Sequence, residues 1–279
     1  MARKIVVTSG KGGVGKTSIT ASLGIAISSK GYSVLMIDAD IGLNNLDVVM
    51  GLENRIMYDL CDALKNRCTL KQALVQDDKN LNLYILPSQK AFSTENISSA
   101  VFKSVLNKLD MMFDYILIDS PAGIDVGFHR AVCGANEAIV VTTSHVSSIR
   151  DADKVISLLN GYNLDSINVI VNRARGDLIE KGEMLSGVQV ANILKKFLIG
   201  VVPEDDYITI LGQVGRIALN QSKSRKSINL IANYLLSGQL SIYDPTKGYK
   251  SLLKRIFTRF GGVYEWEQNS RRENKKVIA

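Results

Sequence analysis

The chain has few cysteines and lacks long apolar runs, internal repeats and low-complexity tracts. Its three cysteines, Cys61, Cys68 and Cys133, have a spacing that fits neither a metal site nor an even set of disulfides. Reduced thiols, as in a cytoplasmic protein, are therefore predicted, with Cys61 and Cys68 two turns apart along one helical region. No apolar run reaches the eighteen or so residues that span a bilayer. The basic, apolar start is no secretory signal, because three apolar residues lead directly into a glycine-rich run.

Most of the chain also carries almost no net charge. Residues 247–279 hold nine Lys or Arg and three Glu, a net charge of +6, which leaves +1 of the total of +7 for the first 246 residues. The basic character therefore belongs to the tail and predicts an anionic partner for it. With 46% hydrophobic residues among 279, the chain can bury the core of one large α/β domain or two small ones.

A glycine-rich run at residues 9–18 carries the strongest functional signal. It lies between an apolar, strand-like stretch (4–8) and a helix-compatible stretch (18–29), and it meets the phosphate-loop pattern Gly-x4-Gly-Lys-Thr. Glycines let the backbone turn tightly, so that successive N–H groups and the following helix N-terminus form an anion site. Lys16 would reach the β- and γ-phosphates and Thr17 would suit Mg²⁺. The predicted nucleotide contacts in the loop are Gly10, Lys11, Gly12, Gly13, Val14, Gly15, Lys16, Thr17 and Ser18.

The second lysine of this loop, Lys11, has two interpretations. It is either a solvated charge or a group that reaches a nucleotide held by a second subunit. The run Lys-Gly-Gly-x-Gly-Lys-Thr at residues 11–17 resembles the deviant Walker A signature of the MinD and ParA ATPases and the nitrogenase iron protein. The resemblance implies that Lys11 and Lys16 act in catalysis and that ATP drives formation of a homodimer. An electron-transfer role like that of the iron protein would need paired cluster cysteines, which Cys133 alone does not supply.

Apolar runs alternate with amphipathic helical stretches along the chain. The runs at 5–8, 33–37, 83–86, 115–118, 138–142, 167–171 and 198–202 are predicted as strands, and helices are expected at 100–109, 148–159 and 188–196. Consecutive Val and Ile are typical of strands buried on both faces. The expected fold is a P-loop NTPase: an α/β, doubly wound, mostly parallel sheet with helices on both faces, plus a C-terminal amphipathic helix. Its ligands would bind at the carboxyl ends of the strands.

Aspartates follow two of these strands. Asp38 and Asp40 end the second strand and Asp119 ends the strand at 115–118, where carboxylates could hold Mg²⁺ through water or orient an attacking water. Helix caps or turns are the alternative. Residues 38–47, 119–124, 146–154 and 200–205 are similar to MinD family segments. By that resemblance Asp40 positions the hydrolytic water and Asp38 and Asp119 support Mg²⁺. It also implies that Asn172, Pro203, Glu204 and Asp205 hold the adenine.

The tail is predicted to form an amphipathic helix after a turn or short linker at 244–248. One helical face of the tail is apolar and the other is basic, a pattern that favours insertion into an anionic membrane interface. Docking on the body or on a partner protein is the alternative. The predicted membrane residues are Tyr249, Leu252, Leu253, Lys254, Arg255, Ile256, Phe257, Arg259 and Phe260. The helix resembles the membrane-targeting helix of the MinD family, although residues 263–279 extend beyond that pattern and are expected to be polar and disordered.

The expected divisions are an ATPase domain (1–243), a linker with the helix (244–262) and the polar tail (263–279). The expected function is that of an ATP- and Mg²⁺-dependent ATPase of the MinD type, which positions the division septum from the inner face of the cell membrane. Its partners would be a division inhibitor and a topological regulator or scaffold, with helix 148–159 as a candidate contact or merely a solvated face. A ParA-type partitioning ATPase is disfavoured by the body's net charge of +1. A flagellar-placement relative is disfavoured because the chain starts directly at the first strand, and no specific nucleic acid is expected.

Overall fold

The computed structural model describes residues 1–40, 45–88, 97–206 and 222–249. Eight strands form one sheet in the order β3-β4-β2-β5-β1-β6-β7-β8, and only the edge pair β3–β4 is antiparallel. All seven predicted strands are confirmed. The strands are β1 (Arg3–Thr8), β2 (Val34–Asp38), β3 (Val75–Gln76), β4 (Leu83–Leu86), β5 (Tyr115–Asp119), β6 (Glu137–Thr142), β7 (Ser166–Ala174) and β8 (Phe197–Pro203).

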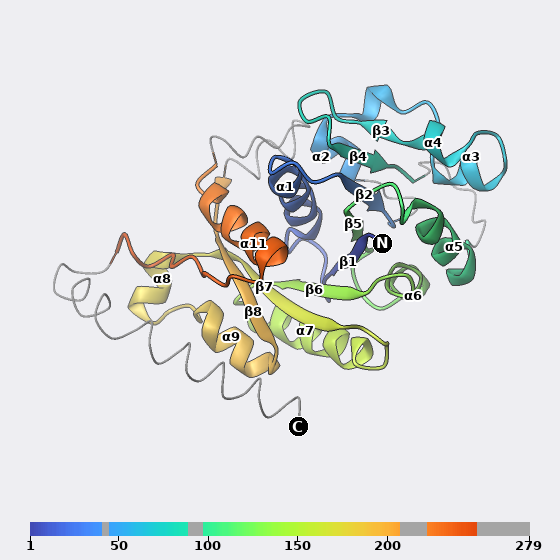
Figure 1. Ribbon diagram of the computed structural model, residues 1–279. Coiled ribbons are helices and arrows are strands. Elements are labelled where there is room, and N and C mark those ends of the chain that lie inside the picture. Colours follow the sequence, from blue (N-terminus) through green and yellow to red (C-terminus); the bar gives the residue numbers. More distant parts are fainter. Residues whose placement is uncertain (41–44, 89–96, 207–221, 250–279) are drawn as a thin grey trace.

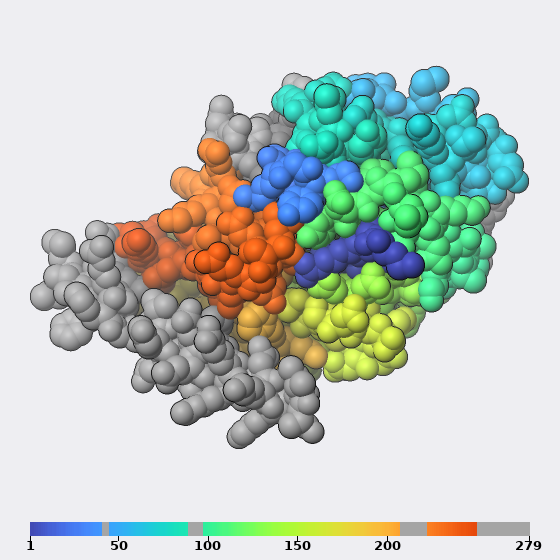
Figure 2. Space-filling model, in the orientation of Figure 1, coloured from blue at the N-terminus to red at the C-terminus, as the bar shows by residue number. Residues whose placement is uncertain are grey.

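Helices cover both faces of the sheet, as the doubly wound prediction requires (Figure 1). The helices are α1 (Lys16–Ser28), α2 (Leu46–Met50), a 3₁₀ turn (Glu53–Arg55), α3 (Leu60–Leu64), α4 (Leu70–Ala73), α5 (Ser99–Leu109), α6 (Val126–Val132), α7 (Val146–Leu159), α8 (Gly176–Lys181), α9 (Gly187–Leu194) and α11 (Arg225–Ser237). Helices α1, α2 and α11 pack on one face, whereas α5, α6, α7 and α9 pack on the other. Figure 2 shows α11 lying directly against α1.

Each central strand contributes side chains to two hydrophobic cores, because its side chains alternate between the two faces of the sheet. In β1, Val7 lies in the core under α1 and α11, while Val6 lies in the core under α5, α6 and α7, and both are fully buried. This two-sided burial explains why the strands read as continuous apolar runs. The shared parallel direction brings the carboxyl ends of β1, β2, β5, β6, β7 and β8 to one edge.

Two local predictions need correction. Helix α1 begins at Lys16, two residues before the predicted start, directly after the left-handed Gly15. Cys61 and Cys68 do not share a helix: α3 ends at Leu64, and Asn66 has a φ of 57°, which turns the chain away. The three cysteines, all in the described part of the chain, form no disulfide.

The predicted turn near residue 244 is confirmed. The Thr246 backbone N–H and hydroxyl both donate to Asp244 Oδ1, at 2.9 and 2.6 Å, and the Tyr249 N–H donates to the Thr246 carbonyl at 2.8 Å. Of the predicted membrane residues, Tyr249 is described, and Leu252, Leu253, Lys254, Arg255, Ile256, Phe257, Arg259 and Phe260 lie outside the described residues. No helix within the described ranges is both long and apolar enough to cross a membrane.

Candidate functional site

The glycine-rich loop joins β1 to α1 at the carboxyl edge of the sheet. Gly13 and Gly15 have φ values of 79° and 90°, in the left-handed region that side chains disfavour. A Cβ on Gly10 would lie 2.2 Å from the backbone of Asp151 in α7, and one on Gly15 would lie 2.4 Å from Asn172 Nδ2. The glycines therefore permit both the turn of the loop and its close packing against α7 and β7.

Lys16 lies inside the site and pairs with Asp119 at the end of β5. Its Nζ is 3.1 Å from Asp119 Oδ1, and the two side chains are only 9% and 2% exposed. The hydroxyls of Thr17 and Thr20 donate to the same carboxylate, at 2.7 and 3.0 Å. Three donors from the first turns of α1 thus converge on one buried acceptor. Thr20 was not predicted, because its partner Asp119 comes from a distant segment of the chain.

Asp38, at the end of β2, is 1% exposed and beside Asp119, with which it pairs across the sheet. Its carboxylate accepts three backbone N–H groups: Asp40 at 3.0 Å and Asn45 and Leu46 at 3.1 Å each. Burial, and next the negative charge of Asp119, raise the pKa of Asp38 to about 7, although the backbone donors oppose this. The negative charge of Asp119 disfavours ionisation of Asp38, and a bound cation would offset that repulsion.

Asp40 is half-buried just beyond β2, at the same edge. Burial raises the pKa of its carboxyl group; the positive charges of Lys16 and Arg130 oppose the rise, and the charge of Asp119 adds to it. Arg130 is on α6 and only 9% exposed; its Nη1 donates to the Ile97 carbonyl at 3.3 Å, and its Nε has no partner. Sequence analysis did not single out Arg130, because its position on a short helix gives no motif.

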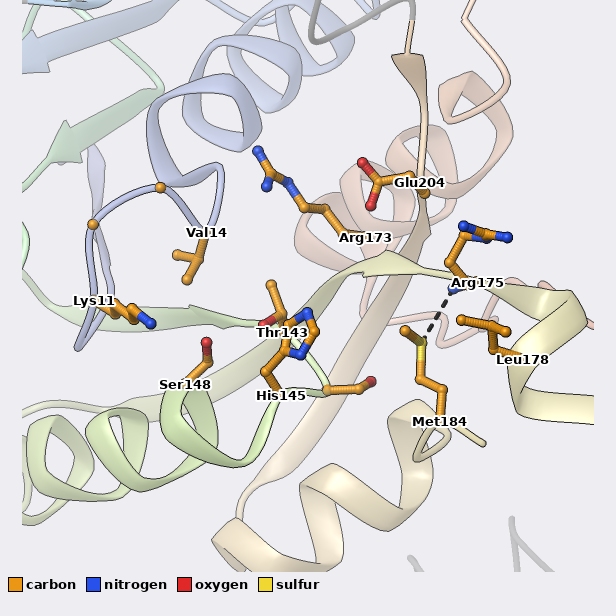
Figure 3. Close-up of a pocket in the computed structure, with 13 residues that line it drawn as sticks. Lys11, Val14, Thr143, His145, Ser148, Arg173, Arg175, Leu178, Met184 and Glu204 are labelled. Carbon is orange, nitrogen blue, oxygen red and sulfur yellow. Dashed lines mark hydrogen bonds between the residues drawn. The ribbon is translucent and has the colours of Figure 1, made fainter. Parts of the chain in front are cut away.

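Lys11, in contrast to Lys16, is exposed at the rim of the loop. Its Nζ lies 3.4 Å from the Ser147 hydroxyl. It borders an open cavity of about 390 Å³ between the loop, the start of α7, and the ends of β7 and β8. Figure 3 shows Lys11 and Val14 on one side of this cavity and Arg175, Leu178 and Met184 on the opposite side, with Arg173 pointing toward the loop. The two lysines therefore face different surroundings, one buried and paired, the other open.

The predicted adenine residues fall into two groups in the structure. Asn172 is 7% exposed and donates from Nδ2 to the Val14 carbonyl at 2.9 Å, and so it fixes the loop. Glu204 lines the cavity, and its backbone N–H donates to the Ala174 carbonyl at 3.1 Å.

Pro203 and Asp205 face the start of α11. The Pro203 carbonyl accepts from the Ser224 hydroxyl at 3.2 Å, and the Asp205 carboxylate accepts from the Ser222 hydroxyl at 2.6 Å and the Ser224 N–H at 2.9 Å. Asp205 therefore anchors the beginning of α11 here. A contact between any of these four residues and adenine stays a prediction.

Arg173 is a further residue that the sequence analysis missed. It has a φ of 57°, where the β7–β8 register is irregular, and it lines the cavity beside Asn172. A side chain other than glycine at such a φ is uncommon and costs roughly 1–2 kcal/mol. No sequence pattern predicts an arginine in this left-handed backbone conformation.

The residues at this edge combine a glycine-rich loop, a buried lysine and carboxylates that could bind water or a hard cation. Hydrolysis of a nucleoside triphosphate depends chiefly on such positioning and charge neutralisation. The fold and site define the protein as a P-loop ATPase.

Comparison with known proteins identifies the family to which this ATPase belongs. A family model described as an AAA domain matches residues 2–173. The chain is 42% identical over 265 residues to the septum site-determining protein MinD of Synechocystis. The aligned region covers 94% of this chain and 100% of that protein. The chain belongs to the MinD family, and it is a MinD-type division-site ATPase. This assignment favours the MinD-type prediction over the partitioning and flagellar alternatives.

Solved structures agree with the fold. The MinD chain in a MinC:MinD cell division complex from Aquifex aeolicus superposes with a TM-score of 0.80 at 40% identity, covering 87% of this chain and 98% of that one. MinD from Pyrococcus horikoshii complexed with Mg-ADP superposes with a TM-score of 0.77 at 29% identity, covering 85% and 97%.

Proposed function

We propose that this protein is a nucleotide-controlled membrane switch at the division site. It binds ATP with Mg²⁺, forms a homodimer, attaches to the anionic inner face of the cell membrane through its tail, and releases after hydrolysis. The observation that carries the proposal is the different placement of the two loop lysines. Lys16 is buried against Asp119, whereas Lys11 is exposed at the rim, where a second subunit could be reached.

The donor set at the loop fits Mg²⁺, which favours oxygen ligands and keeps several waters. Thr17 offers a hydroxyl, and Asp38 and Asp119 offer carboxylates. Burial, and next the charge of Asp119, raise the pKa of Asp38. Among the described residues, no group of three or more His, Cys, Asp or Glu side chains forms a metal cage. The nucleotide phosphates and water would therefore complete the coordination. Bound Mg²⁺ would neutralise phosphate charge.

The protein's own groups would supply the remaining catalytic work. The loop N–H groups and Lys16 hold the phosphates, and Asp40 orients the attacking water as its half-buried position allows. Burial raises the pKa of the Asp40 carboxyl group, and the positive charge of Arg130 opposes that rise. Lys11 would contact the nucleotide of the second subunit and so link dimerisation to ATP.

Dimerisation would control attachment by joining two weak membrane anchors. The tail segment 249–260 carries four basic residues, each contributing about 1 kcal/mol near an anionic leaflet. One twelve-residue helix is marginal alone and binds reversibly. Two helices held in one dimer gain effective concentration, which can raise avidity by roughly 10²–10⁴-fold.

A partner surface is available on α7. Arg150, Asp153 and Lys154 are exposed, and Asp151 is partly exposed and lies 3.3 Å from Lys154. The Aquifex aeolicus relative is seen in a MinC:MinD complex. We infer that a division inhibitor and a topological regulator or scaffold bind this protein, with α7 as the candidate contact.

Sedimentation with anionic liposomes tests the switch. The full chain should sediment with vesicles in ATP but not in ADP, and a chain ending at Thr246 should remain in solution with either nucleotide. Lys11→Ala should lose both ATP-dependent dimerisation and sedimentation, whereas Lys30→Ala, which removes an exposed lysine far from the loop, should behave as wild type. Tight vesicle binding by a monomeric Lys11→Ala protein would contradict the dimer-based switch. ATP-dependent DNA binding without vesicle binding would favour partitioning.

A further inference from the structure

The edge of the sheet opposite the phosphate loop carries an open hollow of about 470 Å³. The loop follows the carboxyl end of β1, whereas the hollow lies at the amino ends of the parallel strands β2 and β4 and is bordered by α4 and β3, at the upper right of Figure 1. We call it the amino-edge groove, and its principal lining residues are Lys71, Gln76, Leu81, Tyr84, Met112 and Phe113.

The groove has an aromatic floor and an apolar rim. The rings of Tyr84 and Phe113 pack edge to face, with their centroids 5.4 Å apart. Leu81 and Met112 at the rim are 67% and 44% exposed, and Met111, which lines an adjoining hollow, is 83% exposed. Large apolar side chains that gather on a surface mark an interaction site, and methionine adapts well to a partner.

Hydrogen bonds fix the shape of the groove before anything binds. Gln76 Nε2 donates to the Tyr84 hydroxyl at 2.8 Å and to the Leu81 carbonyl at 2.7 Å. The Gln76 carbonyl in turn accepts from Arg55 Nη1 at 3.0 Å. Because β3 has only two residues and this carbonyl is already bonded, its edge is a poor template for an added strand. Recognition of a helix in the groove is the mode that remains.

Three lysines surround the groove. Lys71 lines it, and Lys30 and Lys79 are exposed nearby, where the Asn80 side chain joins the β3–β4 turn to the end of α1 through a 2.6 Å bond to the Ser28 hydroxyl. Within the described ranges, the ammonium groups of these lysines form no ion pair. They are therefore available to the carboxylates of a partner.

The acidic side chains at this edge are already engaged. The Asp114 carboxylate accepts the Ser33 backbone N–H and hydroxyl at 2.8 and 3.2 Å, and Asp78 pairs with Arg55. Asp77 Oδ1 accepts the Lys79 backbone N–H at 3.4 Å. The charge left free is positive, which favours an acidic occupant. The chain's own segment 247–279, with a net charge of +6, does not match it.

We propose that the amino-edge groove binds an acidic amphipathic helix of a partner protein. An apolar side chain of the helix enters between Leu81 and Met112 and rests on the aromatic floor, while its carboxylates face Lys71 and Lys79. The groove lies at the opposite edge of the sheet from the phosphate loop and does not include α7. The partner therefore binds in either nucleotide state, beside the ligands of the proposed switch.

Two synthetic helical peptides test the occupant with the full chain. Both carry leucines at positions i, i+3, i+4 and i+7; one has glutamates at the other positions and one has lysines. In fluorescence anisotropy the glutamate peptide should bind about tenfold or more tightly than the lysine peptide, because complementary charge sets specificity. Its affinity should be equal in ATP and ADP, and it should fall as salt screens the exposed charges.

Variants at exposed positions place the peptide on the groove. Leu81→Asp and Met112→Asp should each weaken binding of the glutamate peptide about tenfold, as loss of a central apolar contact does. Ile193→Asp is the matched control, since Ile193 is 54% exposed on α9, and it should bind as wild type does. Lys71→Glu combined with Lys79→Glu should reverse the preference toward the lysine peptide. Thermal unfolding checks that each variant is folded.

Three outcomes would overturn the proposal. The first is equal binding of the two peptides, or binding that Leu81→Asp and Met112→Asp leave unchanged. The second is a preference of the wild-type chain for the lysine peptide, which would indicate a basic occupant such as the chain's own tail. The third is loss of the ATP-dependent homodimer in Leu81→Asp but not in Ile193→Asp, measured by analytical ultracentrifugation, because the groove would then be a contact between two copies.

Discussion

Replacing Lys16 with methionine should destabilise the nucleotide-free protein as well as abolish catalysis. The substitution removes the cation but keeps an apolar side chain of similar length. The charges of Lys16 and Asp119 are 3.1 Å apart and almost fully buried, which gives an attraction of about 5 kcal/mol at an effective dielectric constant of about 20. Breaking a buried pair usually costs about 3–5 kcal/mol. Because Thr17 and Thr20 still donate to Asp119, we expect about 3 kcal/mol.

A double-mutant cycle with Asp119→Asn measures the coupling of this pair. Asp119→Asn strands the buried lysine and should also cost about 3 kcal/mol, but the double variant has neither charge and should lose much less than the sum. Urea denaturation at pH 6 is suitable, because Asp38, with a pKa of about 7, is then mostly protonated and its repulsion with Asp119 is small. Each single variant should lower the melting temperature by about 6–12 °C.

Additivity would refute the reasoning. If the two single losses sum to the double loss within about 0.5 kcal/mol, the pair has no coupling and does not stabilise the unliganded site. ATP hydrolysis gives an independent control, since all three variants should be inactive whatever their stability. Lys30→Ala, at an exposed turn, should change neither stability nor hydrolysis.

Three further predictions concern the loop and the groups around it. Binding of Mg²⁺ and nucleotide should lower the raised pKa of Asp38 and so release up to about half a proton at pH 7, measured by calorimetry in buffers of different ionisation enthalpy. Gly15→Ala, at a φ of 90° and 2.4 Å from Asn172 Nδ2, should weaken binding of a fluorescent ATP analogue about tenfold or more while unfolding stays cooperative. Asp205→Ala should cost about 1–2 kcal/mol in urea denaturation, because Ser222 and Ser224 lose their acceptor; an equal loss of ATP affinity would instead support the predicted adenine contact.

The sign of the Asp38 effect also fixes how stability depends on pH. The pKa of Asp38 is raised from 3.8 to about 7 in the folded protein, so the folded state binds this proton more tightly than the unfolded state. Its contribution to the stability of the nucleotide-free protein should therefore fall as pH rises from about 4 to 7 and level off above that. Mg²⁺ with nucleotide should reduce this dependence.

The sequence specified the sheet better than it specified the contacts within the site. Strands such as β5 and β7 were predictable because burial on both faces demands unbroken Val and Ile runs. The two-residue β3 carries no such run, and it forms only by pairing with the adjacent strand β4. The error at Cys61 and Cys68 has a similar origin, because the left-handed Asn66 ends the helical path without a glycine or proline to signal it.

Site residues could be predicted where a local sequence motif or the end of a predicted strand marks their position. The loop glycines and Lys16 follow from local geometry, and Asp38 and Asp119 follow from their positions at strand ends. Thr20 and Arg130 could not be inferred in this way, because their partners Asp119 and Ile97 come from distant segments. The contacts of Asp205 with the start of α11 and of Gly176 with Pro245 likewise depend on the tertiary fold.

The electrostatics of the unliganded site explain how a small ligand could affect distant elements. Asp38 and Asp119 are buried side by side at the ends of paired strands, with Lys16 held against one of them. A cation and phosphates would change the balance of charge on Asp38, whose carboxylate holds the backbone N–H groups at the start of α2. The same phosphates would lie beside the cavity that Arg175 of the α8 turn lines. A ligand at this site could therefore act on the start of α2 through the hydrogen bonds that Asp38 accepts.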